Sequence, residues 1–183
     1  MTAARLRDAE EGDLGAIQEI YAHHVRHTLS SFEETPPDLA EIGRRWQTVT
    51  AARLPYIVCE ADGRVVGYAY AVRYRLRPAY RYSVENSVYV APDAVRRGYG
   101  RMLMSELIER CTEMGFRQMI AVIGDRDNHA SIGLHRHMGF VDAGHLPAIG
   151  FKHGRWVDVM MMQRALGPGL AEPPDPEAPA GLA

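Results

Sequence analysis

The stretch from Arg81 to Arg101 contains a strand, a glycine-rich turn and a helix in immediate succession. Residues 83–90 alternate between apolar and polar side chains, which predicts a β-strand with Glu85 at its middle. From Gly98 onward, apolar residues return at helical spacing as far as Met114, which predicts a helix. A chain built on this unit must place a strand and a helix next to each other through a tight turn.

The turn itself favours an anion-binding site. It holds three arginines and two glycines at Arg96, Arg97, Gly98, Tyr99, Gly100 and Arg101. Such a turn serves either to let a strand enter a helix closely or to offer helix N-terminal N–H groups to a phosphate, and the arginines favour the second use. The Gly-Lys-Ser/Thr ending of nucleotide triphosphate sites and the third glycine of dinucleotide sites are both missing. A turn that binds phosphate but lacks the motifs for nucleotide hydrolysis indicates coenzyme A as the ligand.

Composition restricts the remaining possibilities. A chain of 183 residues, 46% hydrophobic and 24% charged, is expected to form a single soluble domain with a real core. A net charge of −2, with one lysine among 21 basic residues, argues against nucleic acid or an anionic membrane as a partner. Cys59 and Cys111 fall on apolar faces, which predicts reduced core cysteines and a cytoplasmic protein. No signal peptide or membrane-spanning stretch is expected.

Outside this unit the pattern predicts further strands and helices. Strands are expected at residues 4–8, 55–61, 64–74 and 118–124, with an Asp62-Gly63 hairpin turn and two more strands within 140–164. Helices are expected at about residues 13–26, from a Thr35 cap to about 53, and after Asn128. We expect one domain over residues 1–166 and a disordered, proline-rich tail over 167–183.

Two groups of polar residues leave alternatives open. His23 and His27 share a helix face as zinc ligands do, but no convincing third ligand accompanies them. We therefore expect no metal site and interpret His23, His24 and His27 as histidines on a polar face. The loop at residues 75–81 carries Arg75 and Arg77, which are either solvated or able to clamp an anionic group of a substrate.

Several motifs, taken in order, resemble one family. The strand at residues 82–90, the Arg-x-Gly-x-Gly entry to a long helix, the strand at 121–124, Asn128-x-x-Ser131, Leu134-His135, Gly139-Phe140 and the stretch 152–158 resemble the GNAT superfamily of acetyl-CoA-dependent N-acetyltransferases. The match is closer to its phosphinothricin and methionine sulfoximine acetyltransferase branch and covers about residues 4–164. One departure is Val95, where the family usually carries Gln or Arg.

The resemblance implies an α/β (α+β) fold and a cofactor site. The fold would be a single twisted mixed sheet of about six to seven strands with about four helices, splayed between the Glu85 strand and the Gln118 strand. Acetyl-CoA would lie in that gap and pair with the backbone of the Glu85 strand as an added strand would. The cofactor-binding residues implied are Val88, Tyr89, Val90, Arg96, Arg97, Gly98, Tyr99, Gly100, Arg101 and Asn128.

N-acetylation needs a base, an oxyanion site and a route for protonating the departing thiolate. Glu85 would be the base, acting directly or through water, and the alternative is a solvent-facing strand residue. His135 stands where many relatives carry a catalytic tyrosine, so it is either the general acid or a packing residue. The resemblance implies that the substrate lies against Arg75, Leu76, Arg77, Glu85, Asn86 and Ser87.

We therefore expect an acetyl-CoA-dependent N-acetyltransferase that acts on the α-amine of a small glutamate-like amino acid analogue. Acetylation of protein N-termini or other amines is the alternative among enzymes. A non-catalytic acyl-CoA sensor is the alternative from another class, and Glu85 argues against it. The family resemblance also implies a homodimer.

Overall fold

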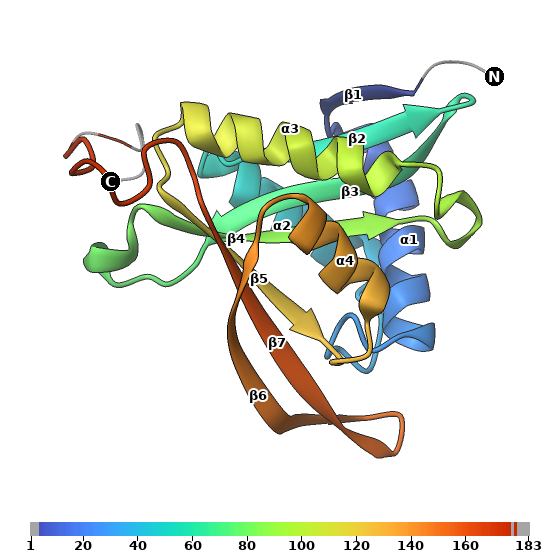
Figure 1. Cartoon of the computed structure of the whole chain (residues 1–183). Helices are drawn as coiled ribbons and strands as arrows, with labels where there is room; N and C mark the ends of the chain where they lie inside the picture. Colours follow the sequence, from blue (N-terminus) through green and yellow to red (C-terminus); the bar gives the residue numbers. More distant parts are fainter. Residues whose placement is uncertain (1–3, 177, 179–183) are drawn as a thin grey trace.

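Within the part of the chain that the structure describes, seven strands form one mixed sheet in the order β1-β2-β3-β4-β5-β7-β6 (Figure 1). The structure is a computed structural model that describes residues 4–176 and 178. The strands are β1 Arg5–Asp8, β2 Tyr56–Ala61, β3 Arg64–Arg73, β4 Ser83–Val90, β5 Gln118–Gly124, β6 Val141–Lys152 and β7 Arg155–Ala165. Every neighbouring pair is antiparallel except β4 and β5, which are parallel.

The four α-helices of the described residues cover the sheet, two on each face. They are α1 Leu14–His27, α2 Leu39–Ala51, α3 Tyr99–Glu113 and α4 His129–His137, and short 3-10 helices lie at Glu11–Asp13, Pro78–Tyr80 and Pro92–Ala94. In Figure 1, α3 and α4 lie in front of the sheet while α1 and α2 lie behind it. The sheet is therefore the middle layer, and both of its faces contribute to the core.

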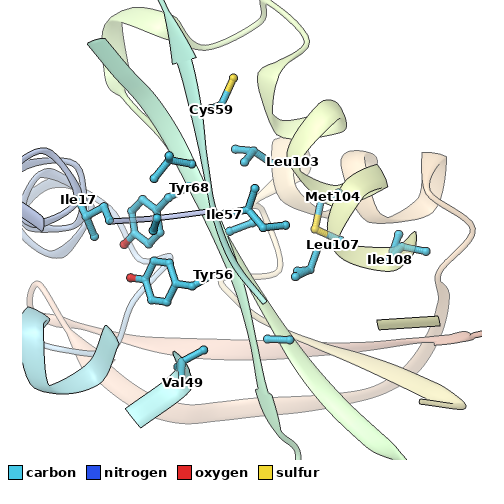
Figure 2. Close-up of a cluster of buried hydrophobic side chains, with 14 of the residues drawn as sticks. Ile17, Val49, Tyr56, Ile57, Cys59, Tyr68, Leu103, Met104, Leu107 and Ile108 are labelled. Atoms are coloured by element: carbon cyan, nitrogen blue, oxygen red, sulfur yellow. The ribbon is translucent and has the colours of Figure 1, made fainter. Parts of the chain in front are cut away.

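The central strands are hydrophobic on both sides because helices cover both faces. Figure 2 shows Tyr56 and Tyr68 on the side of Ile17 and Val49, and Ile57 on the side of Leu107 and the rest of α3. Tyr56 and Ile57 are adjacent residues of β2, and both are buried. This is the alternation expected of a strand packed between two helical layers.

The sheet splays open between β4 and β5. Their parallel pairing is limited to Ser83–Gln118, Val84–Met119 and Glu85–Ile120, after which the two strands separate. The carbonyl of Tyr82 accepts from Gln118 N–H, so every second residue of β4 presents its backbone toward β5. The N–H and C=O groups of Asn86, Val88 and Val90 therefore face the gap between the separating strands β4 and β5, which we call the fork. The predicted splay between the Glu85 and Gln118 strands is confirmed.

One predicted helix start is wrong. Asp38, rather than Thr35, is the N-cap of α2, and its carboxylate accepts from the backbone N–H of Glu41. The pattern Thr35-Pro-Pro-Asp38 resembles a capping box, but Pro36 and Pro37 lie before the helix and leave Asp38 to satisfy its first free N–H groups. The Asp62-Gly63 hairpin turn is confirmed, and the extra residue in the β2–β3 register is Val66, next to Gly67.

The end of the chain packs against the domain as far as it is described. Leu166 is buried, and the guanidinium of Arg117 donates to the carbonyl of Pro173 at 2.9 Å. Residues 177 and 179–183 of the predicted tail lie outside the described residues, so the disordered tail over 167–183 stays a prediction. Within the described part of the chain, no helix combines the length and hydropathy that a membrane span requires.

Candidate functional site

A cavity of about 480 Å³ occupies the fork between β4 and β5. Its walls come from both strands, the turn before α3 and the start of that helix, α4, one residue of α1 and Ser30 of the loop that follows α1. Most of the predicted site residues line it, namely residues 86–90, Arg96, residues 98–101, Asn128 and His135. The five remaining predicted residues, Arg75, Leu76, Arg77, Glu85 and Arg97, are not among its lining residues.

The start of α3 presents free N–H groups to this cavity. Gly98 is the N-cap in a left-handed conformation with φ 87°, and no side chain caps the helix. Arg96 is also left-handed, with φ 61°, a conformation that costs a residue other than glycine about 1 kcal/mol or more. Strained backbone just before an uncapped helix N-terminus is the arrangement found at anion sites, because the helix dipole favours negative charge there.

The β4 edge is open to a ligand except at its end. The carbonyl of Val90 is 3.0 Å from Nε2 of His24 in α1, so this carbonyl is not free for a ligand. His24 lines the cavity, and burial lowers its pKa, so the neutral ring can donate from Nε2. Its interpretation as a histidine on a polar face is therefore wrong. The signal was present, because His24 follows Ile17, Ile20 and Tyr21 at seven, four and three residues.

Glu85 is half-buried at the middle of β4. Burial raises the pKa of its carboxyl above the usual range, and the positive charge of Arg75 partly opposes this shift. Its side chain lies on the same face of β4 as Ser87 and Tyr89, both of which line the cavity. A carboxylate with a raised pKa beside an open site is suited to accept a proton near neutral pH.

Three of the six predicted substrate residues, Arg75, Leu76 and Arg77, lie in the loop between β3 and β4, and their surroundings differ. Arg75 stacks on the ring of Tyr74, 4.4 Å from its centroid, and its charge acts on Glu85. Leu76 is 89% exposed, and Arg77 is the exposed residue that caps the Pro78–Tyr80 helix. The positive charge of Arg75 therefore acts on the pKa of Glu85, whereas Leu76 and Arg77 are not among the causes of that shift.

His135 and Asn128 are both tied into α4 by hydrogen bonds. Asn128 caps the helix by accepting from Ser131 N–H, and its amide donates to Ser30 Oγ at 3.4 Å. His135 is 2% exposed, with Nδ1 2.8 Å from the carbonyl of Ser131 and Nε2 2.9 Å from Nδ2 of Asn86. Burial lowers the pKa of this imidazole.

Sequence reasoning missed the loop at residues 28–34, which forms part of the cavity wall. Lys152 of β6 is 3% exposed, and its ammonium donates to the carbonyls of Ser31 at 2.6 Å and Thr28 at 3.1 Å. Tyr21 and Arg45 hold Glu33 of the same loop through hydrogen bonds of 2.8 and 2.6 Å. Nothing in the local sequence distinguishes a buried lysine from a solvated one, because its partners are more than 120 residues away.

Potential metal ligands do not form a cluster among the residues that the structure describes. No group of three or more His, Cys, Asp or Glu side chains is arranged to hold an ion there. The rings of His23 and His27 lie 4.8 Å apart on α1.

The sequence of the chain resembles those of known acetyltransferases. The model of the acetyltransferase (GNAT) family matches residues 17–140. The chain is 53% identical over 167 residues to a phosphinothricin N-acetyltransferase of Alcaligenes faecalis, covering 91% of this chain and 85% of that protein. It is 40% identical over 172 residues to an L-methionine sulfoximine/L-methionine sulfone acetyltransferase of Pseudomonas aeruginosa, covering 93% and 99% of the two chains.

A solved structure shows the same fold. The crystal structure of a GNAT superfamily phosphinothricin acetyltransferase from Sinorhizobium meliloti, in complex with AcCoA, superposes with a TM-score of 0.93 at 48% identity. The match covers 97% of this chain and 96% of that one. With a family model over more than half of its length and relatives of this identity over nearly all of it, the chain belongs to the acetyltransferase (GNAT) family.

Proposed function

We propose that this acetyltransferase transfers the acetyl group of acetyl-CoA to the α-amine of a small glutamate-like amino acid analogue of the phosphinothricin, methionine sulfoximine or methionine sulfone type. The observation that carries the proposal is the β4–β5 fork, where an uncapped helix N-terminus, an open strand edge and a half-buried carboxylate converge. The names of the relatives at 53% and 40% identity support the substrate class.

Acetyl-CoA would bind through backbone groups at both ends of the cavity. The N–H groups at residues 96–101 would hold the pyrophosphate, with Arg96, Arg97 and Arg101 adding charge. The pantetheine arm would pair with Val88 and with the N–H of Val90, since the Val90 carbonyl is engaged by His24. Tyr89 and Asn128 would complete the wall of this site.

The reaction is direct attack of the amine on the thioester. Glu85, itself or through water, would take a proton from the substrate ammonium, and the freed amine would form a bond to the thioester carbon. Backbone N–H groups around Val88 and Val90 would stabilise the oxyanion that develops. Collapse of this intermediate breaks the C–S bond, the nitrogen loses the second of its ammonium protons to leave a neutral amide, and the thiolate of coenzyme A takes up one proton.

Arg75 is the residue best suited to hold the substrate's α-carboxylate. A guanidinium meets a carboxylate with two parallel charged hydrogen bonds, and the charge of Arg75 already acts on Glu85. A carboxylate held there would bring its α-amine toward the base. Leu76, Arg77, Asn86 and Ser87 are the other residues that we assign to the substrate. A polyamine would instead require acidic residues, and residues 74–81 contain none.

The test of this function is release of the coenzyme A thiol with a panel of amines. We expect kcat/KM for methionine sulfone, methionine sulfoximine or phosphinothricin to exceed that for spermidine by at least about 100-fold, because spermidine has no carboxylate to pair with Arg75. Turnover of peptide N-termini or polyamines without any free amino acid analogue would reject the substrate class while leaving the acetyltransferase. The absence of thiol release with every amine in the panel would be the behaviour of a non-catalytic sensor.

Arg75→Ala should weaken substrate binding more than chemistry. We expect KM for methionine sulfone to rise by about 10-fold or more while kcat changes less, the pattern of lost uniform binding. Because Arg75 lowers the pKa of Glu85, its removal should also move the acid limb of the kcat profile to higher pH. Steady-state kinetics across pH measure both effects.

Arg81→Ala is the matched control for Arg75→Ala. Arg81 lies in the same loop, and its guanidinium is likewise 4.4 Å from a tyrosine ring centroid, that of Tyr82. It does not contribute to the pKa shift of Glu85. Equal rises in KM for the two variants would mean that the loop acts only through its general positive charge, and Arg75 would lose its assignment.

Two further properties belong to this proposal. The chain is expected to work in the cytoplasm, since it shows no helix suited to cross a membrane among the described residues and keeps Cys59 and Cys111 as free, buried thiols. It is also expected to be a homodimer, which sedimentation or light scattering would test. A monomer at working concentration with full activity would remove the dimer from the proposal.

A further inference from the structure

The hydrogen bonds of His135 fix which nitrogen carries its proton. Nδ1 is 2.8 Å from the carbonyl oxygen of Ser131, which can only accept, so Nδ1 must donate. A neutral imidazole with its proton on Nδ1 has a lone pair on Nε2. That nitrogen is 2.9 Å from the amide Nδ2 of Asn86, which can only donate. The ring is therefore arranged to accept a hydrogen bond from Asn86.

Asn86 stands at the point where the sheet opens. It follows Glu85, the last residue of β4 that pairs with β5, and its side chain is 7% exposed. Its Nδ2 group serves His135 and also lies 3.5 Å from the sulfur of Met104. Its Oδ1 atom is buried and bonded to no atom of the protein. An unpaired buried carbonyl costs about 1–3 kcal/mol, so an atom kept in this state calls for a partner from outside the chain.

We infer that His135 is a positioning residue that acts through Asn86. By accepting from Nδ2, it holds the amide so that Oδ1 stays unpaired within the protein and can accept a hydrogen bond from an N–H group of a ligand bound in the cavity that Asn86 lines. Two N–H groups reach this point in the proposed function, on which the inference rests: an amide of the pantetheine arm and the attacking amine. The inference replaces the role of proton donor for His135.

A donor role would require a different state of the same residues. Nε2 could give a proton to a thiolate only if it carried one, and with Nδ1 already protonated the ring would then be a cation. The groups that contact the ring are Asn86 of β4, Ser131 of α4 and Phe140, whose ring lies 5.0 Å away, and none of them is ionisable. Burial lowers the pKa of His135, and no charged side chain contributes to that shift.

The two roles predict opposite dependences of activity on pH. A positioning histidine must be neutral, so activity should fall when the pH decreases through its pKa, which lies below the usual range. A proton donor must be charged, so activity should fall when the pH increases through that value. Glu85, which must be ionised to act as a base, also causes activity to fall only as the pH decreases. A loss of kcat at rising pH that disappears in a His135 variant would therefore overturn the inference.

Nitrogen-15 NMR of the imidazole tests the arrangement without any turnover. With ring-labelled histidine in the full chain at pH 7, we expect His135 to show the neutral form protonated at Nδ1, assigned by its loss in His135→Gln. In Asn86→Ala this tautomer should persist, because the carbonyl of Ser131 still holds Nδ1, while the Nε2 shift should move as its donor is lost. A proton on Nε2 of the wild-type ring would overturn the inference.

A double-mutant cycle tests the functional link. We expect His135→Leu to lower kcat/KM by about 10-fold, the size expected when a buried hydrogen bond to a ligand-binding group is lost. His135→Gln, whose amide oxygen can still accept from Asn86, should recover most of that loss. In an Asn86→Ala background, His135→Leu should cost little more, because its effect passes through Asn86. Additive losses, or a glutamine variant as impaired as the leucine variant, would contradict the inference.

Binding measurements identify which N–H group Asn86 serves. Calorimetric affinity for acetyl-CoA and KM for the amine are compared across the same cycle, and the coupling should be found in one of them. A folded His135→Leu variant is verified by its melting temperature, and the glutamine variant serves if leucine does not fold. If the wild type acetylates no amino acid analogue, the proposed substrate fails, whereas the NMR result and the acetyl-CoA coupling still decide the role of His135.

Discussion

Glu85→Gln is expected to lower kcat by about 100-fold or more while leaving affinity for acetyl-CoA nearly intact, because the amide keeps the shape of the side chain and cannot accept the amine proton. Steady-state kinetics with methionine sulfone and calorimetric titration with acetyl-CoA measure the two effects separately. Glu109→Gln, an exposed change of the same kind on α3, is the matched control. A near-normal kcat in Glu85→Gln would remove Glu85 from the chemistry.

The same carboxyl also connects activity to stability. Its pKa in the folded protein is raised by burial, so wild-type activity should fall as the pH decreases through that raised value. For folding the sign is opposite to that of a salt-bridged carboxylate. Its stabilising contribution is present below the unfolded pKa and is lost as the pH rises through the folded pKa. At pH 7 Glu85→Gln should therefore melt no lower than the wild type, although it is nearly inactive.

Local signals predicted much of the fold. The alternation at residues 83–90 and the Asp62-Gly63 turn, where both residues take a positive φ, are features that act over a few residues. The position of Glu85 within β4 follows from the same alternation. Such elements are predictable because strand period, turn conformation and helix termination depend on neighbouring side chains.

Long-range contacts account for what the sequence did not reveal. His24 bonds the carbonyl of Val90, 66 residues away, and Lys152 bonds the loop at Thr28 and Ser31 from the other end of the chain. A histidine or lysine is usually solvated, and only the folded sheet brings these carbonyls within reach. The hydrogen bond between His135 and Asn86 likewise joins residues 49 positions apart, which no helical periodicity could have linked.

The fork itself combines both kinds of information. Residues 86–90 of β4 keep the alternation of a strand and are buried or half-buried, yet their edge toward β5 is unpaired. The alternation of β4 does not indicate where its pairing with β5 ends. The splay was expected from the resemblance to the family. The structure locates the end of pairing at Glu85, so the proposed base stands at the last closed step of the sheet and Asn86 at the first open one.

Gly100 determines how closely the start of α3 approaches the fork. A Cβ atom there would lie 3.4 Å from Cδ2 of Leu134 and 3.7 Å from Cγ2 of Val90, both of which are ordinary contacts. Alanine therefore fits. The two methyl groups of valine reach beyond this Cβ into the narrow space between α4 and the end of β4, where the cofactor's pyrophosphate and pantetheine arm are proposed to pass.

Gly100→Val is accordingly expected to abolish most of the thermal stabilisation by acetyl-CoA. At 100 times its dissociation constant a ligand stabilises by about 2.7 kcal/mol, which corresponds to about 5–10 °C for a domain of this size. A 100-fold weaker affinity leaves about 1 °C at the same concentration, and Gly100→Ala should fall between the two. Melting curves with and without acetyl-CoA measure each shift within one variant, so any change in intrinsic stability cancels.

Gly15→Val, on an open face of α1, should keep the wild-type shift. A full shift in Gly100→Val would show that the cofactor does not pass this turn, and a wild type unmoved by acetyl-CoA would reject the cofactor site itself.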